Sequence, residues 1–218
     1  MSVGSERRSR GFASGIAVAA LASLLIVAPP AHSSPAVSRD TETVAGWVRA
    51  TGDNQGTPFA IVDKKAATVH IFDADGKRRA SSPILLGLAK GDHSVPGIGE
   101  RQMADIRDDE RTTPAGRFVS EPGRNLSGED IVWVDYDAAV SMHRVRATNK
   151  AERRLERLAT PTPADNRISY GCINVPAAFY DAHVKPSFGT AKAVIYVLPE
   201  TRPASTLFET STAQARAR

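Results

Sequence analysis

One cysteine, Cys172, is present among the 218 residues of this chain. A lone cysteine excludes an internal disulfide framework and any metal site built from several thiolates. A buried apolar core must therefore stabilise the fold, and 41% hydrophobic with 24% charged residues are ordinary proportions for a globular protein. The length allows one domain or two small ones.

The N-terminus has the order of charges and apolar residues that is typical of a secretory signal peptide. Three arginines (Arg7, Arg8 and Arg10) precede an uncharged apolar run from Phe12 to Val27, and small and turn-forming residues follow. We therefore predict a signal peptide over residues 1–33. The apolar run is shorter than the roughly 20 residues of a spanning helix, so we expect no stable membrane span after signal removal. An N-terminal membrane anchor is the alternative to export into the periplasm or cell envelope.

The net charge of +4 does not indicate a nucleic-acid partner. Removing residues 1–33 takes away three arginines and one glutamate, so the charge falls from +4 to +2. Lysines and arginines are scattered among acidic residues, and no RNA- or DNA-binding motif is present. We therefore expect no nucleic acid among the partners.

Short apolar runs at strand spacing dominate the middle of the chain and favour a mainly β fold. An Asp-Gly turn at residues 73–76 indicates a hairpin, and the first three runs predict an antiparallel meander. The predicted strands are residues 59–62, 68–72, 82–88, 118–119, 131–135, 139–143 and 193–198.

The remaining segments give the predicted domain organisation. Residues 34–56 are polar and are interpreted as a linker or N-terminal arm, and residues 200–218 as a disordered tail. The long polar stretch 89–113 is predicted as a functional loop. Helices are predicted over residues 149–158 and from Pro176 to Val184.

Cys172 follows Gly171 at a predicted strand-to-helix junction. Backbone N–H groups near a helix N-terminus lower a thiol pKa and can bind an oxyanion. A lone cysteine is more commonly a small buried apolar residue. Export to an oxidising space favours a functional role, because an unpaired thiol there is a liability unless it is used.

A nucleophilic cysteine needs a general base, and histidine is the usual one. Of the five histidines, His143 ends a strand that precedes the Cys172 segment by one connection, and adjacent elements commonly lie together. We therefore predict His143 as the base. His32 falls in the signal region, and His70, His93 and His183 have simpler interpretations as strand, loop and helix-end residues.

Three ordered motifs resemble the L,D-transpeptidase family, whose members carry a YkuD-type catalytic domain. They are His143 followed by Ser169-Tyr170-Gly171-Cys172-Ile173-Asn174, an upstream Thr113-Pro-Ala-Gly-Arg-Phe118 segment, and an Ile-Val-Asp hairpin with an Asp-x-Asp-Gly turn. The resemblance covers about residues 57–199. Each motif alone would be a weak signal, whereas three in order are specific.

The resemblance implies a single-domain, YkuD-like β-sandwich of mixed sheets with one or two short helices. It further implies a cysteine acyl-transfer reaction on peptidoglycan stem peptides, without cofactor or metal. Cys172 would be the nucleophile and His143 the general base and acid. The backbone of Gly171, with that of Cys172, would bind the oxyanion.

Two features depart from the family pattern. Tyr170 stands where the family has a second histidine, and a phenol is a poor general base near neutral pH. The segment between His143 and Ser169 is long, and its extra length corresponds to the predicted helix 149–158. That helix is either a solvated insertion or a basic lid over an acidic stem peptide.

The residues flanking Cys172 have alternative roles. Ser169 orients His143 or the substrate, or is a turn hydroxyl. Asn174 fixes the backbone after the cysteine or contacts substrate. Arg167 binds charged ends of a stem peptide or pairs with Asp165, and Tyr170 is a further substrate-binding candidate.

Two other functions stay open from the sequence. Water or a free D-amino acid in place of a stem-peptide amine would give a carboxypeptidase or an exchange enzyme with the same nucleophile. A catalytically silent peptidoglycan-binding module, with a structural Cys172, is the third possibility. The sequence does not indicate an oligomeric state.

Overall fold

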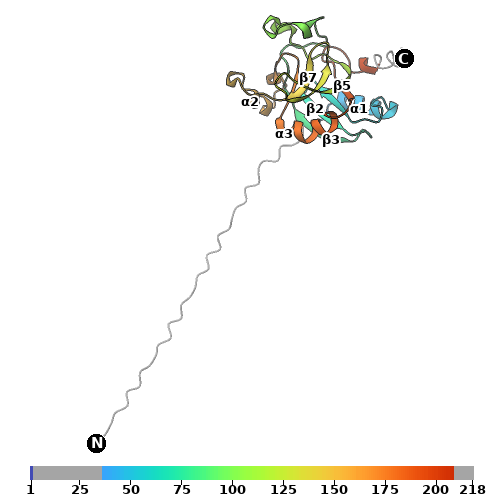
Figure 1. Cartoon of the computed structure of the whole chain (residues 1–218). Helices are drawn as coiled ribbons and strands as arrows, with labels where there is room; N and C mark the ends of the chain where they lie inside the picture. Colours follow the sequence, from blue (N-terminus) through green and yellow to red (C-terminus); the bar gives the residue numbers. More distant parts are fainter. Residues whose placement is uncertain (2–35, 209–218) are drawn as a thin grey trace. The chain divides into compact units, whose positions relative to one another are not determined.

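The computed structural model describes Met1 and residues 36–208 (Figure 1). Residues 36–208 belong to one compact unit. The predicted signal peptide lies, apart from Met1, outside the described residues. Among the residues that are described, no helix is long and apolar enough to cross a membrane.

The first part of the sheet is the predicted antiparallel meander of β1, β2 and β3, closed on its inner side by a late strand. Strands β1 (Phe59–Asp63), β2 (Thr68–Phe72) and β3 (Arg78–Pro83) pair in order. Strand β10 (Ala193–Val197) then pairs with β1 in parallel. The third strand begins earlier than predicted, and residues 82–88 are divided between β3 and the two-residue strand β4 (Leu86–Gly87).

Strand β5 (Gly116–Arg124) carries the sheet from one half to the other. Its first residues pair with β10 as far as Ser120, and its last residues pair with β6 (Asp130–Asp135) from Glu121 onward. Strands β7 (Val140–Arg144) and β9 (Ile173–Val175) follow, with β9 parallel to β7. The order β3-β2-β1-β10-β5-β6-β7-β9 is a mixed sheet, and the prediction of a mainly β fold is confirmed.

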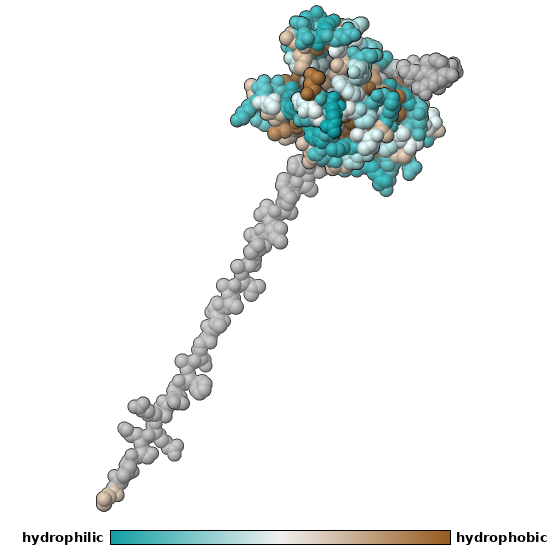
Figure 2. Space-filling model, viewed as in Figure 1, coloured by the Kyte–Doolittle hydropathy of each residue, from teal (hydrophilic) through white to brown (hydrophobic). Residues whose placement is uncertain are grey.

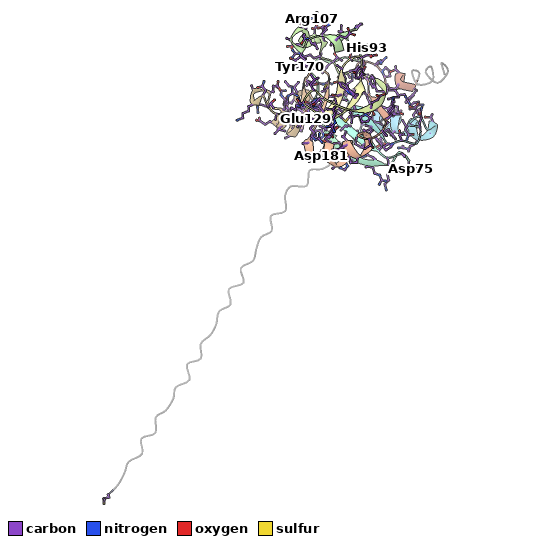
Figure 3. All side chains as sticks on the ribbon, in the orientation of Figure 1. Asp75, His93, Arg107, Glu129, Tyr170 and Asp181 are labelled. Carbon is purple, nitrogen blue, oxygen red and sulfur yellow. The ribbon has the colours of Figure 1, made fainter. Side chains whose placement is uncertain are left out.

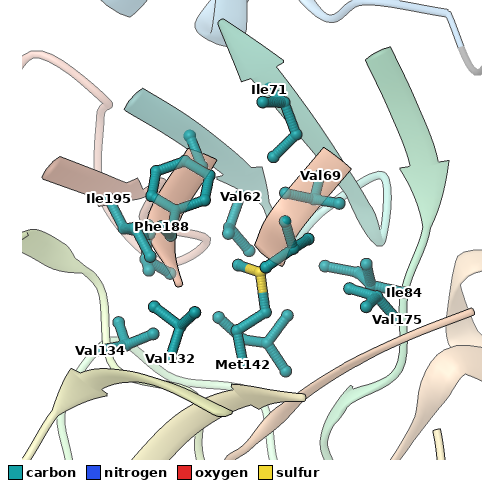
Figure 4. Packing of buried hydrophobic residues seen from close by; sticks show 14 of the residues in the cluster. Val62, Val69, Ile71, Ile84, Val132, Val134, Met142, Val175, Phe188 and Ile195 are labelled. Atoms are coloured by element: carbon teal, nitrogen blue, oxygen red, sulfur yellow. The ribbon is translucent and has the colours of Figure 1, made fainter. Parts of the chain in front are cut away.

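The main core lies where the two halves of this sheet face each other, as the sandwich prediction requires. Figure 4 shows Val62, Val69 and Ile195 on one side and Val132 and Met142 on the other. All five are at most 1% exposed. This packing fixes β7 against the rest of the sheet, so the residues on its opposite face are held on a rigid support.

A second core covers the outer face of the first half. Helix α1 (Arg39–Thr51), capped by Ser38, contributes Val44 and Val48, which are fully buried. Leu207 packs into the same cluster at 1% exposure. Residues 34–56 therefore include a docked helix rather than only a linker, and the predicted disordered tail begins too early. Its residues 209–218 lie outside the described part.

Short helices fill the remaining connections. Residues 149–158 form a 3-10 turn (Lys150–Glu152) and helix α2 (Arg154–Ala159). The long polar loop holds three further 3-10 turns, namely Ile98–Glu100, Met103–Asp105 and Asp108–Glu110. A turn at Pro163–Asn166 precedes β8 (Arg167–Ser169), which pairs with β4. After Pro176 come α3 (Ala177–Phe179), a π-helical segment (Tyr180–Val184) and α4 (Lys185–Phe188).

A buried ion cluster of Lys64, Asp92, Arg167 and Glu200 holds the start of the long loop. Lys64 Nζ donates to Asp92 at 3.0 Å and to the carbonyl of Thr113 at 2.9 Å. Arg167 Nη2 donates to Glu200 at 2.6 Å. Hydrogen bonds from Thr201, Glu200 and Lys64 outweigh burial and hold the pKa of Asp92 well below its usual range. The loop is thus attached to the sheet by charges that are fully paired.

Candidate active site

Strand β7 presents two polar side chains on the face opposite the core. Successive side chains on a strand point to opposite faces. Met142 points into the main core (Figure 4), so its neighbours Ser141 and His143 lie on the other face. Strand β9 pairs with β7 so that Asn174 lies beside His143. This register brings the segment before β9, which contains Cys172, next to Ser141 and His143.

The turn that carries Cys172 requires glycine at position 171. Gly171 has a φ of 128°, and a Cβ there would lie 2.9 Å from the carbonyl oxygen of Thr112. Thr113 Oγ1 donates to the Gly171 carbonyl at 2.7 Å and accepts from the Gly87 amide at 2.9 Å. The Thr-Pro motif therefore supports the cysteine turn, since its fully buried threonine fixes the turn to β4.

Cys172 does not lie at a helix N-terminus, contrary to the sequence prediction. Strand β9 follows it directly, and the next helix begins at Ala177. Burial alone would raise the pKa of the Cys172 thiol. The imidazole of His143 and the hydroxyl and amide of Ser141 outweigh burial and lower this pKa below its ordinary value. Side chains on β7, rather than a helix dipole, favour the thiolate.

His143 is oriented to use one ring nitrogen as a base. Its Nδ1 lies 2.8 Å from the carbonyl oxygen of Arg144, a group that can only accept a hydrogen bond. The proton of the neutral ring therefore belongs on Nδ1, and Nε2 is the acceptor nitrogen, which lies 3.4 Å from Asn174 Nδ2. The site brings His143 and Cys172 together as predicted.

The other described histidines have different surroundings. His70 is fully buried between the hydroxyls of Thr68 and Ser81, and burial together with Arg78 lowers its pKa to about 4. His93 is exposed in the long loop. His183 stacks against Phe179 at a centroid distance of 5.0 Å. None of them contacts Cys172 within the described chain.

Ser169 and Asn174 hold the backbone around Cys172 in this structure, which is the role given first to Asn174 and one of those given to Ser169 from the sequence. They are 3% and 1% exposed. Ser169 Oγ donates to the Cys172 carbonyl at 2.6 Å, and Asn174 Nδ2 donates to the same carbonyl at 3.3 Å. Two side chains thus hold one carbonyl, which fixes the backbone on either side of the thiol.

Arg167 lies in the buried ion cluster. Its side chain is 8% exposed and belongs to the buried ion cluster, where Nη2 also donates to the Lys64 carbonyl at 2.9 Å. Arg167 and Asp165 do not pair either, since Glu200 is the carboxylate that Arg167 contacts. This buried guanidinium uses three of its hydrogen bonds on Glu200 and the Lys64 carbonyl.

The predicted oxyanion donor at Gly171 is already occupied. The Gly171 N–H donates to Ser169 Oγ at 3.1 Å within the turn. The N–H of Cys172, in contrast, has no hydrogen-bond partner within the described part of the chain. Of the two amides proposed from the sequence, only that of Cys172 is free to bind a developing negative charge.

Tyr170 is the one accessible aromatic side chain of the motif. Its ring lies under the guanidinium of Arg111, whose Cζ is 3.9 Å from the ring centroid. Figure 3 shows Tyr170 toward the same end of the molecule as Arg107 of the long loop. The residue that replaces the family histidine therefore contacts this loop through a cation–π interaction.

Sequence reasoning missed two residues of the site. Ser141 Oγ lies 3.7 Å from Cys172 Sγ, and strand alternation from His143 could have identified it. Arg154 of α2 donates to Asn174 Oδ1 at 2.6 Å, and no local signal indicates that contact. In the part of the chain that the structure describes, no group of three His, Cys, Asp or Glu residues could hold a metal ion.

No protein-family model and no curated protein matches this sequence. Solved structures do match. LdtMt1, an LD transpeptidase in complex with imipenem, has 16% identity and a TM-score of 0.37 over 65% of this chain and 59% of its own. The catalytic domain of the E. faecium L,D-transpeptidase has 19% identity and a TM-score of 0.36 over 66% of this chain and 98% of its own.

This chain resembles L,D-transpeptidases. The helical cell shape determining protein Pgp2 from Campylobacter jejuni also matches, with 16% identity and a TM-score of 0.41 over 82% of this chain and 65% of its own. The match with LdtMt1 spans about three fifths of that protein's length. The overlap is too loose at these TM-scores to establish an activity, so any functional conclusion depends on the geometry around Cys172.

That geometry suits acyl transfer. A half-exposed thiol with a lowered pKa lies beside an imidazole whose Nε2 can accept its proton. A free N–H on Cys172 can stabilise an oxyanion on the attacked carbonyl. The surface on the face shown in Figure 2 is mostly hydrophilic, with small separate apolar patches, which suits a polar substrate.

Proposed function

We propose that this protein is an exported cysteine L,D-transpeptidase that acts on peptidoglycan stem peptides through a thioester acyl-enzyme. The observation that carries the proposal is the pairing of Cys172 with His143. Side chains on β7 lower the thiol pKa, and the Arg144 carbonyl orients the imidazole. The three ordered motifs supply the substrate class, and the catalytic domain is proposed to span about residues 57–199.

In the first half of the reaction, His143 Nε2 takes up the thiol proton of Cys172. The resulting thiolate attacks the carbonyl that links a diamino acid, at its L-centre, to the terminal D-Ala. The N–H of Cys172 stabilises the oxyanion. Collapse of this intermediate breaks the C–N bond, and His143 returns the proton to the leaving D-Ala amine.

In the second half, the amine of another stem peptide attacks the thioester. His143 removes a proton from this amine, the C–S bond breaks, and the thiol is regenerated with a new peptide cross-link. Every proton that moves can pass through His143, so the reaction requires no cofactor. Tyr170 and Arg111 lie beside the turn and are proposed to contact the acceptor or donor peptide.

Two other functions are alternatives to this proposal. One uses the same catalytic residues with a different acceptor, and the other involves no catalysis. Water or a free D-amino acid as acceptor would give a carboxypeptidase or an exchange reaction. A silent binding module would need an inert thiol, and the partial exposure and lowered pKa of Cys172 argue against this alternative. The proposed export, by signal peptide or membrane anchor, depends on the sequence of residues 1–33.

Incubation with defined stem peptides tests the proposal. The chain from residue 34 onward is incubated with a tetrapeptide stem, and intact-protein mass spectrometry follows the adduct. We expect a tripeptidyl acyl-enzyme that has lost one D-Ala, followed by a product in which this tripeptide is cross-linked to a second tetrapeptide stem. Absence of adduct, D-Ala release and cross-link in the wild-type protein would refute the enzyme proposal, whereas D-Ala release without cross-link would assign the carboxypeptidase.

A further inference from the structure

Helix α2 is attached to the protein through Arg157 and Leu158. Leu158 is 8% exposed, and Arg157 Nη1 donates to the Asp165 carbonyl at 2.8 Å. Arg157 Nε also donates to the Glu152 carbonyl at 2.9 Å. The inserted helix is therefore held in a defined position and does not behave as a solvated surface extension.

Arg154 extends from this helix toward the cysteine turn. Its side chain is 14% exposed, its Nε pairs with Glu152, and its Nη1 donates to Asn174 Oδ1 at 2.6 Å. The guanidinium is planar, so the pairing with Glu152 on one edge directs another N–H at Asn174. The neighbouring Arg153 is 69% exposed and pairs only with Glu156 among the described residues.

The Asn174 amide has only one orientation that satisfies its surroundings. With Oδ1 toward Arg154, Nδ2 donates to the Cys172 carbonyl at 3.3 Å and lies 3.4 Å from His143 Nε2. A reversed amide would place Oδ1 against the Cys172 carbonyl and Nδ2 against the guanidinium, which are both repulsive. The charged donor on α2 therefore determines which way this buried amide points.

We propose that Arg154 is a positioning residue that couples the α2 insertion to Cys172 and His143 through the side chain of Asn174. With Arg154 in place, Asn174 holds the carbonyl of the nucleophile and one side of the imidazole. Without it, the amide rotates, both contacts weaken, and the imidazole loses its fixed position beside the thiol. For acyl transfer this inference rests on the proposed function, whereas for thiol reactivity it does not.

An open hollow adjoins this contact and suggests how the insertion responds to substrate. It has a volume of about 360 Å³ and is lined by Arg154 together with Lys150, Arg153 and Leu155, among others. Leu155 is 60% exposed on its rim. A peptide that bound in this hollow would press on the residue that orients Asn174.

The rate of Cys172 alkylation by iodoacetamide at neutral pH tests the coupling without any peptide substrate. We expect Arg154→Met to lower the second-order rate constant about fivefold, since directly coupled side chains interact by roughly 0.5–3 kcal/mol. Arg154→Lys keeps a charged donor and should recover at least half of the loss. Arg153→Met is the matched control on the same helix and should alkylate at the wild-type rate.

A double-mutant cycle separates positioning from general support of the fold. In an Asn174→Ala background, Arg154→Met should not lower the alkylation rate further, because Arg154 acts on the thiol through the side chain of Asn174. Wild-type reactivity of Arg154→Met, or full additivity with Asn174→Ala, would overturn the inference. If Arg154→Met unfolds, Glu152→Gln replaces it in the cycle, because it loosens Arg154 without removing it.

The acyl-enzyme assay with the tetrapeptide stem distinguishes this inference from the proposed function. If wild-type protein forms no acyl-enzyme but the alkylation rates follow the expected pattern, the proposed function fails and the coupling holds. An increase in KM for Arg154→Met at unchanged kcat and unchanged alkylation would instead make Arg154 a substrate-binding residue and overturn the coupling.

Discussion

Two polar clusters, the buried ion cluster and the cysteine turn, meet at Thr113. They differ in how many of their polar groups have hydrogen-bond partners. The carbonyl of Thr113 accepts from Lys64 in the buried ion cluster, while its hydroxyl donates to Gly171 in the cysteine turn. In the ion cluster every side chain is at most 8% exposed and has several partners. Such an arrangement fixes the chain and leaves no group available for a ligand.

In the cysteine turn, the supporting groups are saturated but the reacting groups are not. The carbonyls of Gly171 and Cys172 accept short hydrogen bonds. The thiol interacts with His143 and makes long contacts of 3.7 Å with Ser141 and Ala139, and the Cys172 N–H has no partner in the described chain. In this protein, polar groups with several hydrogen-bond partners support the fold. The reacting groups of the cysteine turn are the few with weak partners or none among the described residues.

Replacing the thiol should have the largest effect on activity and almost none on stability. Cys172→Ala removes the only nucleophile, so we expect complete loss of acyl-enzyme with stem peptides. Because the thiol makes only weak contacts, the midpoint of urea unfolding should change little. Residual adduct on this variant would show that another residue is acylated, and a large stability loss would show that Cys172 is structural.

Breaking the ion cluster should have the reverse pattern. Lys64→Met leaves the buried carboxylate of Asp92 without its Lys64 partner, while Glu200 keeps Arg167, and we expect a cost of about 3–5 kcal/mol of unfolding free energy. The matched control is Lys65→Met, whose side chain is 52% exposed and pairs with Asp40, and which should cost about 0–1 kcal/mol. Urea unfolding of both variants measures the difference. Equal costs would mean that the cluster does not support the fold.

Adding a methyl group at the turn should affect both stability and reactivity. Gly171→Ala combines a positive φ with a contact of 2.9 Å to the Thr112 carbonyl, so we expect a cost of about 1–3 kcal/mol and slower alkylation of Cys172. Gly128→Ala also has a positive φ, of 80°, but meets no atom within 4 Å. This control should alkylate normally. Normal alkylation of Gly171→Ala would contradict the role given to the turn.

Local patterns predicted the elements whose structure is set by neighbours in sequence. Apolar runs gave β1, β2, β6, β7 and β10, and the Asp-Gly step gave the hairpin of β2 and β3. The pairing of Cys172 with His143 was also predictable, because one connection separates their elements.

Contacts between distant segments were not predictable from local patterns. The division of β5 between two partners, the docking of α1, and the burial of Arg167 against Glu200 all depend on segments far apart in sequence. Arg154 and Asn174 meet only because α2 folds back over β9.

The pH dependence of Cys172 alkylation tests most directly the claim that His143 activates the thiol. Because the folded thiol has a lowered pKa, the thiolate persists to lower pH than in a free cysteine. We predict a wild-type alkylation midpoint below that of free cysteine. In His143→Gln, the imidazole no longer counteracts the effect of burial on the thiol pKa. The alkylation midpoint should therefore rise toward or above that of free cysteine. A wild-type midpoint at or above free cysteine, or one that His143→Gln leaves unchanged, would contradict the account.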